Sequence, residues 1–274
     1  MKIFRKYLTE DKKAVLTGYL FEKIENTGKR KPWTPEKRPA MLILPGGSYM
    51  YCSPREGEPI ALTFAQEAYQ TFVLEYHCGE DSDYPRPLED VILALDYIKK
   101  NADEFSVDTK EIVLTGFSAG GHLALLYGSS FFRPEFQDLV NRKEEELEVH
   151  KIIAGYPVAY LKELQDLIVK YDIKIDTGKM LYSDEKRRDP YELIDPRMPK
   201  TFIFTTLEDK TVPAHGTVEY VRKMVEKSCD VEFHLFNKGQ HGLSTGDDLA
   251  NYGRDYPKRI HKWVDLAKAW LKEE

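Results

Sequence analysis

Long apolar runs are missing from this sequence of 274 residues. No stretch approaches the ~18 uninterrupted apolar residues that a transmembrane helix requires. The first ten residues, MKIFRKYLTE, also lack the apolar centre of a secretory signal peptide. We therefore expect a protein that works in the cytoplasm and has no membrane partner.

Positive charge is not in excess either. The 40 Lys and Arg residues are outnumbered by 46 Asp and Glu residues, which leaves a formal net charge of −6 at pH 7. Proteins that bind the phosphates of nucleic acids carry a basic face. The balance of charges therefore predicts no nucleic-acid partner.

Cysteine is scarce, and its spacing has no chemical pattern. Cys52, Cys78 and Cys229 form no CxxC pair and no cluster with histidines of the kind that binds zinc. We interpret all three as reduced thiols and expect no metal site.

Apolar material is nevertheless sufficient for a buried core. Hydrophobic residues make up 42% of the chain and aromatic residues 12%, which suits a single domain over residues 1–274. From about residue 40, short apolar runs alternate with longer amphipathic stretches, a pattern typical of α/β proteins. We predict a mostly parallel central sheet with helices on both faces. The predicted strands are 40–44, 71–76, 111–116, 151–156, 201–206 and 231–236, with a strand or hairpin of the sheet edge at 14–23 and helices at 88–100, 118–130 and 257–272.

The alternation is interrupted between residues 158 and 199. This segment contains a charged amphipathic helix, LKELQDLIVKYD, followed by a polar loop and the turn-rich sequence DPYELIDPRMP. A compact crossover connection would need far fewer residues. We interpret 158–199 as a small, cap-like insertion over one end of the sheet.

Residues 116–120 read GFSAG, which fits the pattern G-x-S-x-G. They lie between a predicted strand and a predicted helix, where this motif forms a sharp turn that exposes a nucleophilic serine. The backbone at such a serine is strained, and the turn is possible only if the residues two before and two after it lack side chains. Ser118 is therefore the candidate nucleophile, with a glycine-rich helix cap as the alternative interpretation.

A serine hydroxyl needs a histidine to accept its proton and an acid to orient that histidine. In folds that carry this serine turn the chain order is serine, acid, histidine. His241 stands in a loop after the last predicted strand, and the neighbouring Gly239 and Gly242 permit a close approach. We predict that His241 is the base, and we interpret His215 as a first-turn residue of a surface helix.

The acid is expected in the loop after the strand at 201–206. Two acidic residues, Glu208 and Asp209, stand side by side in this loop. We favour Asp209 and retain Glu208 as an alternative, because the sequence does not tell which of two neighbouring side chains points toward the histidine.

Acyl transfer also needs hydrogen-bond donors for the negatively charged oxygen of the tetrahedral intermediate. The backbone N–H of Ala119, directly after the serine, is one expected donor. The loop after the strand at 40–44 reads PGGS, and its glycines leave N–H groups able to point into the site. Gly47 or Ser48 is the expected second donor.

Together, the PGGS loop, GFSAGGH at 116–122, Asp209 before Val212-Pro213, and GQHG at 239–242 resemble the α/β-hydrolase superfamily of serine esterases. More narrowly, they resemble the bacterial acetylxylan and feruloyl esterase group that is related to hormone-sensitive lipase. The resemblance spans about residues 14–271 and implies a triad of Ser118, Asp209 and His241. Lipase relatives carry His-Gly-Gly-Gly where this chain has Pro45 to Ser48, so the second oxyanion donor stays open.

The resemblance further implies a carboxylesterase that removes acetyl or other short acyl groups from sugars and oligosaccharides through an acyl-enzyme. The expected partner is a small ester substrate, with no metal or organic cofactor and with a homodimer as the possible assembly. His122, four residues after the serine, matches the group and is interpreted as a buried structural residue.

Two other functions stay open. Arylformamidases share the glycine loop and the serine turn, so an amide hydrolase is the first alternative. The second is a non-catalytic binding protein that has retained the hydrolase fold, although every catalytic position is filled.

Overall fold

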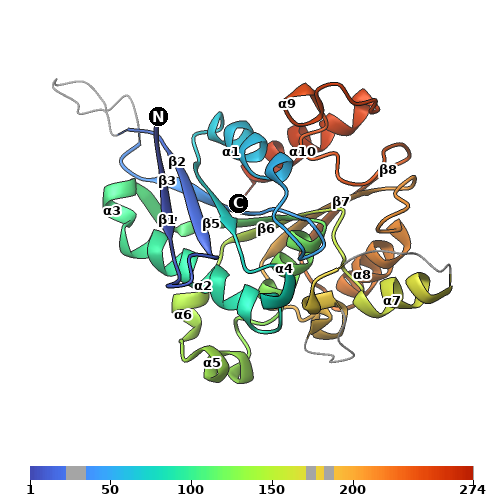
Figure 1. Ribbon diagram of the computed structural model, residues 1–274, viewed down its shortest axis with the longest axis horizontal. Helices are drawn as coiled ribbons and strands as arrows, with labels where there is room; N and C mark the ends of the chain where they lie inside the picture. The colour runs from blue at the N-terminus through green and yellow to red at the C-terminus, as the bar shows by residue number, and fades with distance from the viewer. Residues whose placement is uncertain (23–34, 171–176, 182–187, 274) are drawn as a thin grey trace.

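A single twisted sheet forms the centre of the molecule, with helices packed on both of its faces (Figure 1). The computed structural model describes residues 1–22, 35–170, 177–181 and 188–273. Within these residues the sheet has the strand order β1-β2-β4-β3-β5-β6-β7-β8. Strands β3 to β8 are parallel, whereas β2 is antiparallel to both of its neighbours. The strands are Lys2–Tyr7 (β1), Val15–Leu20 (β2), Arg38–Leu44 (β3), Gln70–Glu75 (β4), Val107–Phe117 (β5), Lys151–Gly155 (β6), Lys200–Thr206 (β7) and Val231–Phe236 (β8).

The predicted α/β class with a mostly parallel sheet is confirmed. Each of the six strands predicted from apolar runs corresponds to one of β3 to β8. Their near-continuous apolar sequences follow from burial on both faces, which parallel strands covered by helices require. The core strands β3 and β6 are accordingly buried along almost their whole length.

The first strand, β1, was not predicted. The edge strand was expected at 14–23, where the structure has β2, and β2 pairs with β1 on one side and with β4 on the other. The sequence of β1, KIFRKY, is exposed at five of its six positions. Because both faces of this edge strand are largely exposed, apolar and polar residues do not alternate along it, and this alternation is the sequence pattern that predicts a strand.

Two groups of helices cover the sheet. Helices α2, α4 and α8 pack on one face, and α1 and α10 pack on the other, each against its own apolar cluster (Figure 1). The helices are α1 (Glu58–Ala65), α2 (Arg86–Lys100), α3 (Ala102–Phe105), α4 (Ala119–Gly128), α5 (Pro134–Val140), α6 (Glu144–Leu147), α7 (Leu161–Lys170), α8 (Ala214–Glu226), α9 (Asp248–Asn251) and α10 (Lys262–Trp270). Short 3-10 helices are η1 (Pro54–Glu56), η2 (Gly79–Asp81), η3 (Lys179–Leu181), η5 (Pro190–Leu193) and η6 (Lys258–His261).

The predicted helices are present with shifted ends. α2 and α4 lie within one or two residues of the predicted helices at 88–100 and 118–130. The predicted helix at 257–272 is divided into η6 and α10, and η6 follows Pro257. α4 is buried at every position, which explains its strongly apolar sequence.

The long connection between β6 and β7 contains the predicted insertion at 158–199. Its charged amphipathic helix is α7, and its described remainder holds η3 and η5. Residues 171–176 and 182–187 of the insertion lie outside the described residues. The segment around η3 packs against η2, and Gly178 donates its N–H to the carbonyl of Ser48 at 2.8 Å. The insertion therefore contacts the loop that follows β3.

We expect Trp263 of α10 to be a main source of stability on its face of the sheet. Its ring is fully buried, stacks on Phe204 of β7 at 4.4 Å between centroids, and donates its indole N–H to Ser244 O at 2.9 Å. Trp263→Ala should lower the free energy of unfolding by about 3–5 kcal/mol. Urea denaturation followed by far-UV circular dichroism measures this change.

The matched control is Val225→Ala on α8, where the side chain is 63% exposed. Its effect should stay within about 0.5 kcal/mol. Similar shifts of the denaturation midpoint in both variants would contradict the role given to Trp263.

Candidate active site

The three residues of the predicted triad lie at one edge of the sheet. Ser118 directly follows β5, Asp209 follows β7, and His241 follows β8. These strands are parallel, so their carboxyl ends share one edge, which is where ligands bind in open α/β sheets.

Ser118 occupies a strained turn. Its φ of 52° and ψ of −117° lie outside the regions that side-chain-bearing residues normally adopt. A Cβ at Gly116 would lie 2.1 Å from the carbonyl oxygen of Gly120, and a Cβ at Gly120 would lie 2.0 Å from that of Leu44. The turn can therefore form only with glycine at both positions, and this requirement explains the spacing of the glycines in G-x-S-x-G.

A hydrogen-bonded relay links the three side chains. His241 Nε2 is 2.8 Å from Ser118 Oγ, and His241 Nδ1 is 2.6 Å from Asp209 Oδ2. The other carboxylate oxygen of Asp209 accepts the N–H groups of Thr211 and Val212, both at 2.9 Å. The Asp209 carboxylate is buried and fully bonded, so it holds the imidazole with Nδ1 protonated and Nε2 free to accept the serine proton.

Glu208, the alternative acid, points elsewhere. Its carboxylate forms an ion pair with Lys238 and accepts the N–H of Gly239 at 3.1 Å. Of the two neighbouring acids, the structure brings only Asp209 to the imidazole of His241.

The loop after β3 carries Gly47 and Ser48, of which one is the expected second oxyanion donor. Gly46 donates its N–H to the buried carboxylate of Glu56 at 2.9 Å, which removes it as a donor to a substrate. The described residues provide no acceptor for the N–H groups of Gly47, Ser48 or Ala119. Gly47 has a φ of +127°, and a Cβ there would lie 2.1 Å from Tyr51 O, so glycine is required for this loop conformation.

The other histidines after the serine do not reach it. His215 pairs with Glu163 of α7, and His261 contacts the carbonyl of Thr245 at 2.7 Å. His234 is paired with Glu232 within β8. His150 lies just before β6, at the opposite edge of the sheet from Ser118.

His122 is buried, as the sequence suggested, but it also links two parts of the site. Its Nε2 is 2.8 Å from the carbonyl oxygen of Arg188 in the insertion, so this nitrogen must carry the proton. Nδ1 then accepts the hydroxyl proton of Tyr49 at 2.8 Å. Tyr49 belongs to the loop that carries the expected oxyanion donors Gly47 and Ser48 (the oxyanion loop, residues 45–49), so His122 ties that loop to the insertion. Neither contact has a sequence signal, because the partners are 73 and 66 positions away.

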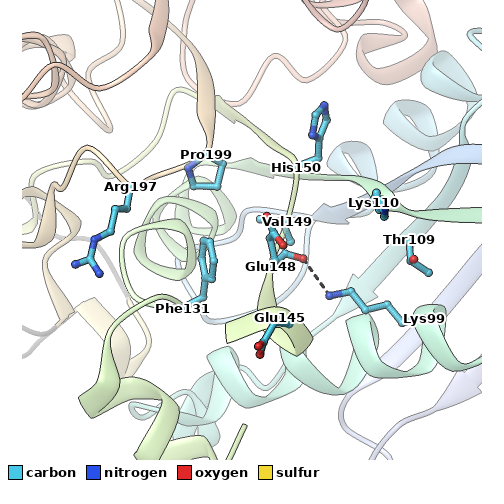
Figure 2. A pocket seen from close by; sticks show the side chains of 10 residues that line it. All are labelled: Lys99, Thr109, Lys110, Phe131, Glu145, Glu148, Val149, His150, Arg197 and Pro199. Atoms are coloured by element: carbon cyan, nitrogen blue, oxygen red, sulfur yellow. Dashed lines mark hydrogen bonds between the residues drawn. The ribbon is translucent and has the colours of Figure 1, made fainter. Parts of the chain in front are cut away.

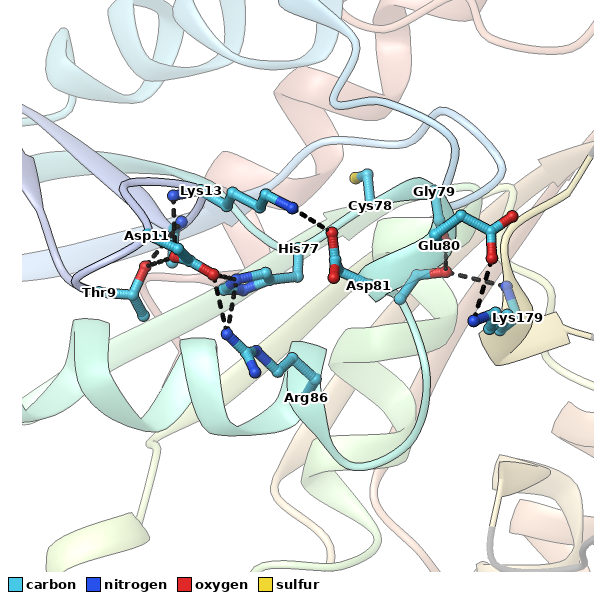
Figure 3. A network of polar contacts seen from close by, with 12 residues as sticks. Thr9, Asp11, Lys13, His77, Cys78, Gly79, Glu80, Asp81, Arg86 and Lys179 are labelled. Carbon is cyan, nitrogen blue, oxygen red and sulfur yellow. Dashed lines mark hydrogen bonds and ion pairs between the residues drawn. The ribbon is translucent and has the colours of Figure 1, made fainter.

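A polar network joins the turn between β1 and β2, the segment after β4 and the insertion (Figure 3). The buried imidazole of His77 contacts Asp11 at 2.9 Å and Asp90 at 2.8 Å. Beyond it, Lys179 of the insertion pairs with Glu80 of η2 at 3.1 Å. The described end of the insertion is thus fixed to the segment that follows β4.

A cavity lies at the amino edge of the parallel strands, opposite the edge that carries Ser118. It is lined by residues that include Lys99, Lys110, Glu148 and His150 (Figure 2). Lys99 donates to the carbonyl oxygens of Glu146 and Glu148, at 2.7 and 3.0 Å, and the described residues that line the cavity include neither a serine nor a cysteine.

The described residues contain no group of three or more His, Cys, Asp or Glu side chains placed to hold a metal ion. None of the helices within them is both long enough and apolar enough to cross a bilayer.

Comparison with known proteins identifies the family. The profile of the BD-FAE family matches residues 31–224, which include Ser118 and Asp209. The chain belongs to the BD-FAE family. The match ends before His241, whose place in the site rests on the geometry described above.

Curated relatives of this BD-FAE protein include enzymes named for xylan. Endo-1,4-beta-xylanase B of Butyrivibrio fibrisolvens is 29% identical over 77% of this chain and 33% of its own length. Acetylxylan esterase of Xylanibacter ruminicola is 23% identical over 93% of this chain and 51% of its own length. The chain therefore spans a third to a half of these curated relatives. Hormone-sensitive lipase of Mus musculus is 28% identical over 33% of this chain and 12% of its own length.

Solved structures match over nearly the whole chain. MGS-M1, an alpha/beta hydrolase from a Medee basin deep-sea metagenome library, is 33% identical with a TM-score of 0.76, and covers 99% of this chain and 96% of its own. The carboxylesterase Cest-2923 of Lactobacillus plantarum is 28% identical with a TM-score of 0.85, and covers 99% and 97%. The predicted α/β-hydrolase fold and the resemblance to esterases of this group are confirmed.

We expect His122 to make stability depend on pH. Burial lowers the pKa of its imidazole to about 4, against 6.5 for the unperturbed group. In the unfolded chain His122 binds its proton near pH 6.5, so between pH 6.5 and 4 the unfolded state holds more protons and stability falls as the pH falls. The loss should reach about 3 kcal/mol at pH 4, at ~1.4 kcal/mol per pKa unit.

His122→Gln, which does not titrate, should lack this component of the pH dependence. Urea denaturation of both proteins between pH 7 and pH 4 gives the two stability profiles. Parallel profiles would show that another group is responsible for the loss.

Proposed function

We propose that this protein is a carboxylic ester hydrolase that removes acetyl and other short acyl groups from sugars or oligosaccharides. The observation that carries the proposal is the relay from Asp209 through His241 to Ser118, with Ser118 held in a strained turn at the carboxyl edge of the sheet. This arrangement activates a serine for attack on an acyl carbon.

In the proposed mechanism, Ser118 Oγ forms a bond to the ester carbonyl carbon while His241 Nε2 takes its proton. The N–H group of Ala119 and that of Gly47 or Ser48 stabilise the negative oxygen. The tetrahedral intermediate then collapses, and the alcohol leaves with the proton from His241. Water attacks the acyl-enzyme with the help of the same imidazole, which releases the acid and restores Ser118.

The residues around His241 support a substrate whose alcohol part is polar. The groove beside this imidazole is lined by residues that include Lys210, Lys238, Asp255 and Tyr256, which suit hydroxyl groups better than acyl chains. The names of acetylxylan esterase and of Salmonella typhi acetyl esterase, which is 27% identical over 33% of this chain, support acetyl esters as the substrates.

Short esters should be cleaved faster than long ones. We expect kcat/KM to fall from p-nitrophenyl acetate through the butyrate to the octanoate, and we expect release of acetate from peracetylated xylose or xylo-oligosaccharides. Ser118→Ala should remove the activity by a factor of at least about 10³. Equal rates in Ser118→Ala and the native protein would refute the proposal, and faster turnover of an aryl formamide would favour amide hydrolysis.

The identity of the acid can be tested separately. Asp209→Asn should reduce kcat by about 10⁴, because an amide at this position favours the wrong tautomer of His241. Glu208→Gln should cause a much smaller fall, since it loses only an exposed ion pair with Lys238. Steady-state kinetics on p-nitrophenyl acetate distinguish the two, and a larger loss in Glu208→Gln would reverse the assignment.

A further inference from the structure

Glu56 is a buried carboxylate close to the site that the mechanism above does not use. It ends the short helix η1 and is 4% exposed. Its two oxygens accept hydrogen bonds from different segments, the N–H of Gly46 at 2.9 Å and the hydroxyl of Tyr156 at 2.6 Å. A buried charge is tolerated only when donors of this kind compensate its lost hydration.

Gly46 connects Glu56 to the oxyanion loop. It directly precedes Gly47, the candidate second donor, and its own Cβ position would lie 2.7 Å from Glu56 Oε2. The carboxylate therefore packs directly against the backbone that must aim the N–H groups of Gly47 and Ser48. A shift of this carboxylate would change the direction of those donors.

Tyr156 connects Glu56 to the loop of the base. Burial and the neighbouring Glu56 carboxylate raise the pKa of its phenol well above the usual value, so the hydroxyl stays protonated and donates a hydrogen bond to Glu56. The same oxygen accepts the N–H of Ser244 at 3.0 Å, and the ring lies edge-on to the imidazole of His241, 5.1 Å between centroids.

The preceding residue, Arg55, also binds the loop that carries His241. Its guanidinium donates to Gly242 O and to Ala250 O, each at 2.8 Å, and its backbone carbonyl accepts the hydroxyl of Ser244 at 2.6 Å. The two consecutive residues of η1 thus bind the loop that carries His241 at several points.

We propose that Glu56 is a positioning residue that joins the oxyanion loop and the His241 loop into one unit. Two donors converge on it: the N–H of Gly46 in the oxyanion loop, and the hydroxyl of Tyr156, which follows β6 and itself accepts the N–H of Ser244 in the His241 loop. Only a group that accepts at both oxygens satisfies both donors. A carboxylate does this, whereas an amide presents an NH₂ group to one of the donors. The inference rests on the proposed function, because alignment of these loops matters only if the intermediate forms between them.

The predicted result is a loss of kcat in Glu56→Gln with little change in KM. The oxyanion donors act on the transition state more than on bound substrate, so their misalignment lowers kcat. We expect a fall of about 10- to 100-fold on p-nitrophenyl acetate. The affinity for a trifluoromethyl ketone, which mimics the tetrahedral intermediate, should fall by a similar factor.

Tyr156→Phe tests the second connection by itself. It keeps the ring beside His241 and the Glu56–Gly46 bond, but removes the link to Ser244. Its kcat should also fall, and the double variant Glu56→Gln/Tyr156→Phe should lose less than the product of the two single effects, because both act through one connection. If Glu56→Gln does not fold, the result for Tyr156→Phe decides.

The matched control is Lys151→Met, which also neutralises a buried charged side chain. Lys151 lies at the amino end of β6 and donates to the carbonyl of Glu273 at 2.6 Å, far from the edge that carries Ser118. We expect this variant to be less stable, by thermal denaturation, but to keep its kcat below its melting temperature.

The outcomes separate the two proposals. A native protein that cleaves none of the esters overturns the proposed function and this inference with it. An active native protein overturns the inference alone if both Glu56→Gln and Tyr156→Phe keep their kcat, if they change only KM, or if Lys151→Met loses as much kcat as they do.

Discussion

The close approach of two backbones at the turn between β5 and α4 is the constraint on which the site depends. Helix α4 begins so near the end of β3 that no side chain fits at Gly120. The loop after β3 also lies against Ser118, since a Cβ at Gly46 would be 2.9 Å from Ser118 Cβ. The candidate nucleophile and the proposed oxyanion donors therefore lie in neighbouring segments of the folded chain, so substrate binding would not have to bring these segments together.

Buried carboxylates hold the rest of the site through hydrogen bonds. Asp209 accepts two backbone N–H groups as well as the imidazole of His241, and Glu56 accepts a backbone N–H and a phenol. Backbone N–H groups are fixed donors, so they compensate a buried charge without the freedom of long cationic side chains. Each of these acids consequently holds a loop in place and also contributes a negative charge to the site.

Sequence patterns predicted the interior of the molecule better than its edges. Strands such as β6 and β7 are apolar because helices cover both of their faces, so their burial can be read from composition alone. β1 is exposed and its position depends on pairing with β2, which no local pattern records. The long connection at 158–199 was recognised by its length and charge, but its contact with Ser48 was not.

The sequence by itself determined the fold class and the places of Ser118 and His241, because strand periodicity and glycine spacing are local properties. Only the tertiary structure showed which of Glu208 and Asp209 contacts His241, since neighbouring side chains diverge and the direction of each depends on β8 and the loop after it. It also showed that Glu56 engages Gly46 and, 100 positions away, Tyr156. Contacts at such separations arise from chain packing, and for that reason the residues that join the loops have no signature in the sequence.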